Sequence, residues 1–495
     1  MTPDVPISAA LAFGGAIASL ALPRRFALIP LGISMCVYPS TLLMPPPQLS
    51  LTPARFIAVV LFMRCILTSG VRSQFKWQLV DTAAFVYFLL ITTSMLMTQP
   101  FGPALNNRAG FFLSALLPFW CARLLITDKA SLFAFTKAML WCAMPLAVFG
   151  MLELLTAWNP WDKIRDYGIL KVPRLGDGWR EFWGARRPRA RGPFLQYIMW
   201  GWLFGLQVAL GMNLWWEKKS FFPWIIPWLF LPWGMISSIA SGPMMLGAAA
   251  FAVMLCFPMR QYWKPAVWTA ALLYVALTGY SNRGPMEIIA GFGMDPLSSW
   301  YRVGLVRFTM QQGGMAGHWL LGYGEIPMPL YIAFHDLCIH WIWLLVIHGI
   351  AGWIGFYGLL GGVGWQLWKA KTKAHTVEDQ WIVWSFMATI LGSLAAMLVV
   401  ALFGETYYIY HLLLGVMANA PLLVGGMSER VVGVIANVNG KRVIYRYRLK
   451  PGQRIALVRQ PGAPAGSETV AVVGEGGKVE TADAATTTTT ATVDR

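Results

Sequence analysis

Charged side chains are scarce in this chain. Only 12% of its 495 residues are Asp, Glu, Lys or Arg, whereas about a quarter of an ordinary soluble domain is charged. With 57% hydrophobic residues and a mean hydropathy of +0.55, the composition excludes a soluble globular enzyme. Apolar runs long enough to cross a bilayer recur between residues 7 and 427. They predict one polytopic helical membrane domain, residues 1–427, followed by a tail.

Cysteine is sparse, and several catalytic motifs are missing. The six cysteines lie in or beside apolar segments without paired spacing, so the sequence indicates neither a disulfide framework nor a zinc site. It also lacks a Gly-rich phosphate loop, a His-Glu-x-x-His motif, a nucleophile elbow and an Asp-x-Asp pair. We therefore expect no metal and no cofactor, and an ATPase, a zinc protease and a nucleotide-sugar transferase all lose support. No cleavable signal pattern precedes the first apolar stretch, which is predicted to be a retained span.

The net charge is strongly positive, with 39 Lys and Arg against 22 Asp and Glu. These bases are scattered between apolar spans and do not gather on one polar face, so we expect no nucleic-acid partner. The apolar segments predict about thirteen spans, or 12–13 transmembrane helices. They lie near residues 7–22, 26–44, 55–70, 79–97, 111–126, 138–157, 194–213, 221–240, 244–258, 265–280, 338–367, 381–403 and 410–427.

Lys and Arg in the short loops predict the orientation. One set of alternate loops carries thirteen positive charges, whereas the short loops on the opposite side carry only Arg108. The basic set is expected in the cytoplasm together with the C-terminus. Two long loops, near residues 158–193 and 281–337, then face outward, and function is expected to reside in them.

The first long loop is basic, with nine Lys and Arg against four Asp and Glu. Because the planar guanidinium of arginine binds phosphate through two hydrogen bonds, the run from Arg186 to Arg191 suits a lipid-linked pyrophosphate or an acidic glycan. Arg189 and Arg191 lie just before a span, which would hold them at the headgroup level. The alternative is a solvated loop that crosses the membrane despite its charge.

The second long loop contains further candidates. We expect Arg302 to be an inward-facing ligand and Arg307 to support it, with Arg283 and His318 as secondary candidates. His335 closes the loop beside Asp336, and a histidine that titrates near neutrality suits the removal of a proton from a sugar hydroxyl. His340 is the second candidate for that base, although a histidine at this boundary also fits a purely interfacial role. Glu405 is the carboxylate expected to face the same cavity, with an interfacial role as the alternative.

The tail differs from the rest of the chain. Residues 428–460 are basic and alternate around Asn439-Gly440, which predicts a β-hairpin close to the cytoplasmic leaflet, where anionic lipid attracts Lys and Arg. Residues 461–495 end in Thr-rich low complexity and are predicted to be disordered.

Four short blocks, taken in order, resemble those of the O-antigen ligase and Wzy-type polymerase superfamily of bacterial envelope polysaccharide enzymes. In the serine-rich turn, residues 237–243, Gly242-Pro243 stands where that family has an arginine. The resemblance covers residues 140–425. The blocks are Arg189-Ala-Arg-Gly-Pro-Phe194, Ser237-Ser-Ile-Ala-Ser-Gly-Pro243, Tyr301-Arg302 through Leu321-Gly-Tyr-Gly324, and His335-Asp336 followed by Gly349-Ile-Ala-Gly352.

The resemblance implies a GT-C-like glycosyltransferase bundle in the bacterial inner membrane, with its active site on the periplasmic face. Arg189, Arg191 and Arg302 would hold the undecaprenyl pyrophosphate of a glycan donor, and His335 would activate an acceptor hydroxyl on a glycan or on lipid A core. Other polysaccharide-assembly proteins are possible partners. Polymerase and ligase differ only in the acceptor and remain open, as do an exporter of lipid-linked sugar or polysaccharide and a non-enzymatic assembly protein.

Overall fold

The computed structural model divides the chain into two units, Met1–Val424 and Gly425–Arg495, each of which is considered by itself. The residues that the structure describes are 4–39, 42, 51–162, 179–182, 184–217, 222–262, 268–269, 272–273, 275–276, 287, 296–327, 330, 337–424, 430–438, 441–449, 454–459, 468–473 and 479–481.

The first part of the helical unit runs from the N-terminus to the first long loop. Several starts follow local capping chemistry: the Thr52 side chain accepts the Arg55 N–H at the start of α3, and Asp128 accepts the Ser131 N–H at the start of α8. A π-helical turn, Phe112–Leu116, joins α6 to α7. The helices are α1 (Asp4–Ala21), α2 (Ile29–Val37), α3 (Pro53–Leu67), α4 (Ser69–Arg72), α5 (Leu79–Thr98), α6 (Phe101–Phe111), α7 (Leu117–Leu125) and α8 (Lys129–Thr156).

The second part begins with a two-stranded ribbon in the first long loop. Its strands β1 (Trp179–Phe182) and β2 (Ala185–Pro188) pair antiparallel, with Arg180 opposite Arg187. Short 3-10 helices occur at Arg24–Phe26, Met212–Trp216 and Phe257–Tyr262. The remaining α-helices are α10 (Tyr197–Gly211), α11 (Phe222–Leu229), α12 (Leu231–Ser237), α13 (Ser241–Leu255), α16 (Pro296–Gln311), α18 (His340–Lys373), α19 (Val377–Met397), α20 (Gly404–Ala418) and α21 (Ala420–Leu423).

Helices of membrane-spanning length and composition dominate this unit. Among the described residues, five helical segments are long and apolar enough to cross a bilayer, and three shorter apolar helices accompany them. The prediction of an all-α membrane protein is therefore confirmed at this level. The five segments are Leu79–Thr98, Phe101–Leu125, Lys129–Thr156, His340–Lys373 and Val377–Met397.

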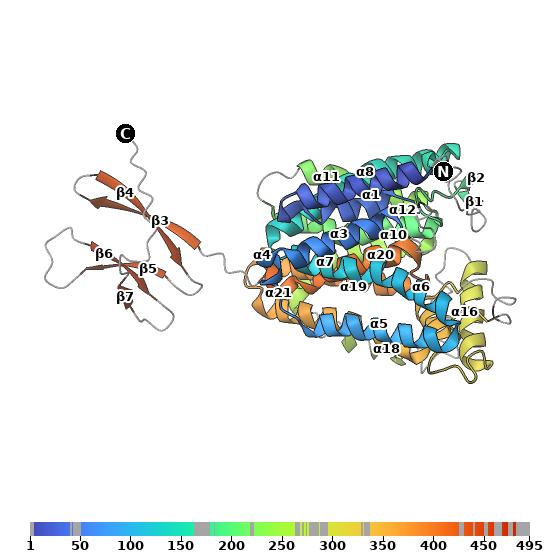
Figure 1. Cartoon of the computed structure of the whole chain (residues 1–495). Coiled ribbons are helices and arrows are strands. Elements are labelled where there is room, and N and C mark those ends of the chain that lie inside the picture. Colours follow the sequence, from blue (N-terminus) through green and yellow to red (C-terminus); the bar gives the residue numbers. More distant parts are fainter. Residues whose placement is uncertain are drawn as a thin grey trace. The chain divides into compact units, whose positions relative to one another are not determined.

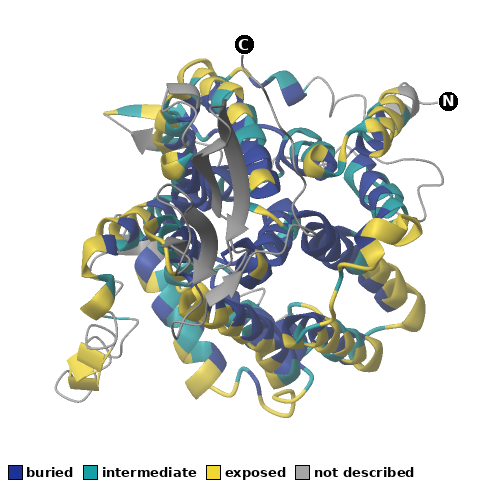
Figure 2. Ribbon diagram, turned by 90° about the vertical axis from the view of Figure 1, so that its left-hand side faces the viewer, coloured by how far each residue is buried: buried dark blue, intermediate teal, exposed yellow. Residues whose placement is uncertain are grey.

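The helices pack in pairs around a shared apolar interior. Helix α5 packs against α18, α13 against α19, α1 against α3, and α7 against α20 (Figure 1). Buried residues gather inside the unit and exposed residues lie on its periphery, as Figure 2 shows. The ribbon β1–β2 and helices α6 and α16 lie at one end, whereas α4 and α21 lie at the other. Described parts of both long loops therefore share an end.

A buried ion pair connects three helices toward the α21 end. Arg123 of α7 donates two hydrogen bonds to Asp81 in the first turn of α5, and it also donates to the side chain of Asn419. Asn419 in turn donates to the carbonyl of Arg123 at 2.8 Å. Because all three side chains are buried, each charge and amide is satisfied by protein.

The second unit is built of strands. Strands β3 (Arg430–Val438) and β4 (Lys441–Leu449) pair antiparallel on either side of residues 439–440, with Val438 opposite Lys441. Strands β5 (Arg454–Arg459), β6 (Glu468–Val473) and β7 (Val479–Thr481) form a separate sheet in that order. Thus β6 and β7 fall within the segment 461–495, for which composition predicts disorder; the valine-rich stretch 470–473 has the β-branched side chains that favour strands.

Candidate functional site

Helix α18 is broken at Gly349, where φ is +65° and ψ is −164°. The helix bonds lost at the break are replaced by the loop that follows α16. The N–H groups of Ile350 and Ala351 donate to the carbonyls of Trp319 and Leu320 at 2.8 and 3.2 Å. In the opposite direction, Tyr323 and Gly324 donate to carbonyls of the first half of α18, at residues 346 and 347, at 2.8 and 2.9 Å. These bonds join the Gly-Tyr-Gly block to the Gly349 block that the sequence singles out.

Glycine is required on both sides of this junction. Gly322 has φ of +70°, a conformation that favours glycine, and a Cβ added there would lie 2.6 Å from the Gly349 nitrogen. A Cβ on Gly349 would likewise lie 2.6 Å from the Gly322 nitrogen. Both positions therefore need glycine for backbone conformation and for space.

A cavity of about 260 Å³ lies beside this junction. Helices α5, α6, α18 and α20 contribute to its wall, together with Gly324 and residues 402–403. Among the described residues that line it there is neither Asp nor Glu, so no carboxylate of these residues opposes a positive charge in the wall. The polar and aromatic side chains are those of Tyr87, Asn107, Arg108, Trp343, His348, Tyr407 and Tyr408.

Arg108 is the charged residue of this wall. Its side chain is buried, with 7% of the residue exposed, and Nη2 donates to Oδ1 of Asn107 at 2.8 Å. The guanidinium also lies over the Phe111 ring, 5.5 Å from the centroid. Within the described part of the chain, Arg108 has no carboxylate partner, and its Nε has no hydrogen-bond acceptor. A buried cation without a counter-ion suits an anionic ligand in the cavity.

His348 contributes a nitrogen with a defined protonation pattern. The Ser94 hydroxyl donates its single proton to the carbonyl of Leu321 at 2.7 Å. Ser94 Oγ lies 3.3 Å from His348 Nδ1 and must therefore accept that hydrogen bond, so the proton of the neutral ring is on Nδ1. This leaves the lone pair on Nε2, the nitrogen that can take a proton.

Arg189 holds the serine-rich turn. Its Nε donates to the carbonyl of Ser238 at 3.2 Å and its Nη2 donates to that of Ile239 at 2.9 Å. The guanidinium also stacks on the Tyr197 ring, 3.1 Å from the centroid. Ile239 has φ of +45°, so the arginine supports a strained turn. The first two blocks of the sequence thus meet, with the Arg189 guanidinium bonded to the serine-rich turn.

Arg191 is fixed by carboxylates. Its Nη2 pairs with Asp162 at 2.6 Å, while Glu153 of α8 accepts the backbone N–H groups of Arg191 and Gly192 at 3.1 and 3.0 Å. Asn159 donates to the other oxygen of Glu153 at 2.9 Å. Arg191 carries its own counter-ion, and neither it nor Arg189 is among the residues that line the 260 Å³ cavity.

Arg302 and Arg307 both lie on α16. Arg302 is half-buried, and its Nε donates to the carbonyl of Val399 at 2.7 Å, three residues before Leu402 of the cavity wall. Arg307 is exposed and forms an ion pair with Glu287. Arg302 is thus fixed to the segment after α19 but is not among the described residues that line the cavity, whereas Arg307 lies on the surface.

The other described candidates are dispersed. His318 is exposed and stacks on Tyr323 at 3.9 Å between centroids. His340 is fully buried, and its Nδ1 accepts the Leu402 N–H at 3.2 Å, which occupies the lone pair a base needs. Glu405 is buried in the first turn of α20, next to Gly404 of the cavity wall. His335, Asp336 and Arg283 lie outside the residues that the structure describes.

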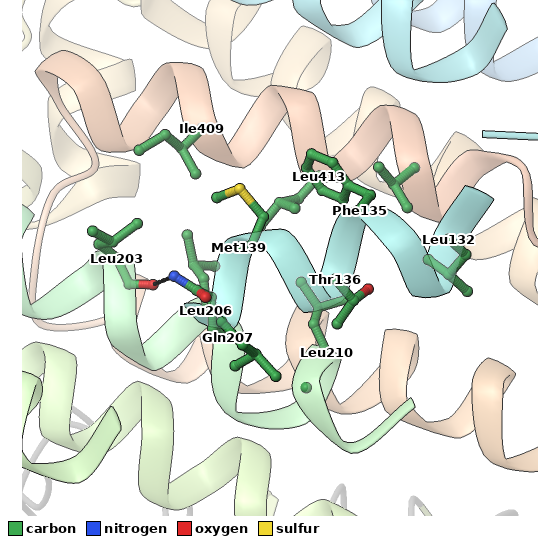
Figure 3. A pocket seen from close by; sticks show the side chains of 13 residues that line it. Leu132, Phe135, Thr136, Met139, Leu203, Leu206, Gln207, Leu210, Ile409 and Leu413 are labelled. Atoms are coloured by element: carbon green, nitrogen blue, oxygen red, sulfur yellow. Dashed lines mark hydrogen bonds between the residues drawn. The ribbon is translucent and has the colours of Figure 1, made fainter. Parts of the chain in front are cut away.

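A second cavity is apolar. Figure 3 shows it between α8, α10 and α20, where Gln207 donates to the carbonyl of Leu203 at 3.2 Å. It holds about 20 Å³, and leucine, isoleucine, methionine and phenylalanine side chains dominate its wall. It has neither the size nor the polar groups for a phosphate or a sugar.

Sequence reasoning did not select Arg108 and His348, which the structure brings together in the wall of this 260 Å³ cavity. Arg108 stands out in the sequence as the single base of the outward short loops, and His348 as a deeper histidine of its span. A single base in a predicted loop otherwise free of charge was the signal available. No protein-family model matches this chain, and no curated protein matches it in sequence.

Proposed function

We propose that this chain is an integral-membrane glycosyltransferase that transfers a glycan or repeat unit from undecaprenyl pyrophosphate to an acceptor hydroxyl. The acceptor is another lipid-linked glycan in a polymerase, or lipid A core in a ligase. The observation that carries the proposal is the 260 Å³ cavity, in which no described carboxylate pairs with Arg108 and His348 has a free lone pair. An anion and a hydroxyl are the two groups that such a wall recognises.

The donor pyrophosphate is assigned to Arg108 and Arg302. Arg108 supplies a buried positive charge in the cavity wall. Arg302 is retained from the family resemblance, and its bond to the Val399 carbonyl fixes it to the segment that precedes wall residues 402–404. The sequence-based assignment of Arg189 and Arg191 to the donor is less well supported, because both guanidinium groups serve contacts within the fold. In this proposal they position the serine-rich turn and the end of the first long loop.

The reaction needs one base and stabilisation of one leaving group. The acceptor oxygen attacks the anomeric carbon, the bond from that carbon to the pyrophosphate oxygen breaks, and the configuration inverts. The hydroxyl proton passes to a histidine, either His335 of the sequence-based assignment or His348 of the cavity wall. The charge on undecaprenyl pyrophosphate grows as it leaves, and fixed arginines stabilise that charge in the transition state.

The proposal includes a specific membrane arrangement. The helical unit is a GT-C-like bundle of 12–13 spans in the bacterial inner membrane, with the α16 end on the periplasmic face and residues 425–495 in the cytoplasm. The thirteen-to-one distribution of positive charge in the short loops supports this orientation.

Complementation tests the proposal. In a strain deleted for this gene, Arg108→Gln, His348→Gln, His335→Ala and Arg302→Ala are compared with wild type at matched membrane abundance, and surface glycan is resolved by length. Arg25→Gln provides the control, because Arg25 is exposed and lies in the 3-10 helix that follows the C-terminal end of α1. We expect Arg108→Gln to lower transfer about 100-fold, since it removes a charge from the leaving-group site.

The accumulated intermediate separates the two enzymes. Single lipid-linked repeats in place of long chains indicate a polymerase, whereas full-length lipid-linked chains that never reach lipid A indicate a ligase. Wild-type glycan in all four variants would refute the assignment.

An exporter of lipid-linked glycan is the second candidate. The broken helix α18 favours it, because transporters use discontinuous helices at their substrate sites. Purified protein in vesicles decides between them: formation of a new glycosidic bond supports the transferase, and movement of unchanged donor across the bilayer supports the exporter.

A further inference from the structure

A basic cavity of about 320 Å³ lies at the α4 end of the helical unit, opposite α16. It is enclosed by the α1–α2 connection, the end of α3, helix α4 and the end of α7. Arg24 and Arg64 both line it, together with Thr68, Gly70 and Gln74. It shares none of its lining residues with the cavity assigned to transfer.

The two guanidinium groups are oriented by neutral acceptors. Arg24 donates to Oε1 of Gln74 at 2.6 Å and to the carbonyl of Leu124 at 3.0 Å, and Arg64 donates to the carbonyl of Ser19. These bonds hold the side chains in place without neutralising them. Neither Asp nor Glu is among the lining residues in the described part of the chain, so the two positive charges share one wall without a described carboxylate.

Exposed apolar side chains flank the lining residues of α3 in the sequence. Met63, Ile66 and Leu67 lie on α3 next to the lining residues, and Leu67 is 76% exposed. A soluble anion needs no such surface, whereas a lipid presents acyl chains beside its phosphate. Arg24 and Arg64, beside the apolar end of α3, therefore match a phosphate group that carries acyl chains.

From this arrangement we infer that the cavity lined by Arg24 and Arg64 binds the phosphate of an anionic membrane lipid. The chemistry shared by all candidate ligands is a phosphate monoester or diester, and the adjoining apolar surface selects the lipid. This inference is independent of the proposed transfer reaction.

Gly70 allows a test that leaves the arginines intact. A Cβ added at Gly70 meets no atom within 4 Å, and the residue is exposed on the cavity wall. Gly70→Asp introduces a carboxylate that competes with the lipid phosphate, whereas Gly70→Asn introduces a neutral group of the same shape. Purified, delipidated full-length protein is titrated with phosphatidylglycerol, phosphatidylcholine and soluble glycerol phosphate, and bound ligand is counted by native mass spectrometry.

We expect wild type and Gly70→Asn to bind phosphatidylglycerol in preference to phosphatidylcholine, and Gly70→Asp to bind it about tenfold more weakly, with equal melting temperatures. The double variant Arg24→Gln/Arg64→Gln should lose the preference, while Arg72→Gln, an exposed base of α4 outside the lining, should keep it. If the double variant fails to fold, the Gly70 pair decides alone. Equal binding of both lipids, or an unaffected Gly70→Asp, overturns the inference. Glycerol phosphate binding as tightly as phosphatidylglycerol overturns the lipid assignment and leaves a soluble phosphate as the ligand.

Discussion

Arg123 and Asp81 face each other through two parallel hydrogen bonds, Nε to Oδ1 at 3.1 Å and Nη2 to Oδ2 at 2.8 Å. Asp81 also accepts the Gln78 N–H at 2.9 Å, which caps the start of α5. The pair therefore fixes the end of α7 to the first turn of α5 inside the protein.

Removing one member of this pair should cost more than removing both. Arg123→Met leaves Asp81 as a buried charge without a partner, and we expect it to lower the free energy of unfolding by about 3–5 kcal/mol. Asp81→Asn/Arg123→Met leaves no such charge and should be closer to wild type. Denaturation of the four proteins of this cycle in detergent measures the coupling. A double variant as unstable as the sum of the single variants would contradict it.

Gly349→Ala should destabilise the helical unit. The substitution forces alanine into a positive φ, which costs about 1–3 kcal/mol, and places Cβ against the Gly322 backbone. Gly361→Ala on the same helix is the matched control, because a Cβ there meets nothing within 4 Å. Melting temperatures in detergent compare the two. Equal melting temperatures would show that the break in α18 does not depend on glycine.

Arg189→Lys separates a positioning role from donor binding. Lysine cannot reach two carbonyls and stack on Tyr197 at once, so we expect lower stability and a parallel loss of active protein. The KM for the donor, measured on the folded fraction, should stay close to that of wild type. A raised donor KM at an unchanged melting temperature would instead restore Arg189 to the pyrophosphate site.

Ser94→Ala tests how His348 is oriented. Loss of the hydroxyl removes the acceptor that fixes the proton on Nδ1, so kcat should fall by about tenfold while the donor KM is unchanged. Thr93→Ala, an exposed neighbour on α5, is the control. An unchanged kcat would argue that His348 takes no proton and would favour His335.

The length and polarity of the apolar segments were enough to predict a helical membrane protein from the sequence. The apolar segment 338–367 is longer than one span requires, and the structure explains its length by the break at Gly349. Hydropathy counts residues in a helix but carries no information on φ, so it cannot locate such a break. The sequence of α18 can remain apolar across the break because the loop after α16 supplies the hydrogen-bond partners that the interrupted helix backbone lacks.

Roles that depend on partners distant in sequence could not be predicted. Arg189 and Arg191 belong to a basic run whose charge favours an anion site, and the sequence does not reveal that they also contact a carbonyl at residue 238 and the carboxylate of Asp162. Arg108 lines the cavity together with residues more than 200 positions away in the sequence, including His348 and Tyr407. A local pattern gives the charge of a side chain, whereas the fold determines whether that charge has a counter-ion.

The close approach of Gly322 and Gly349 also limits the substitutions that the chain can accept during evolution. Each position excludes a side chain because backbone atoms fill the space: those of the other glycine, together with Ile347 beside Gly322 and Leu320 beside Gly349. A change of side chain at one position therefore does not compensate for a substitution at the other. Among descendants that retain the broken helix, both positions should remain glycine. A lineage that replaces either residue should have straightened α18 and lengthened or shortened the loop that now seals the break.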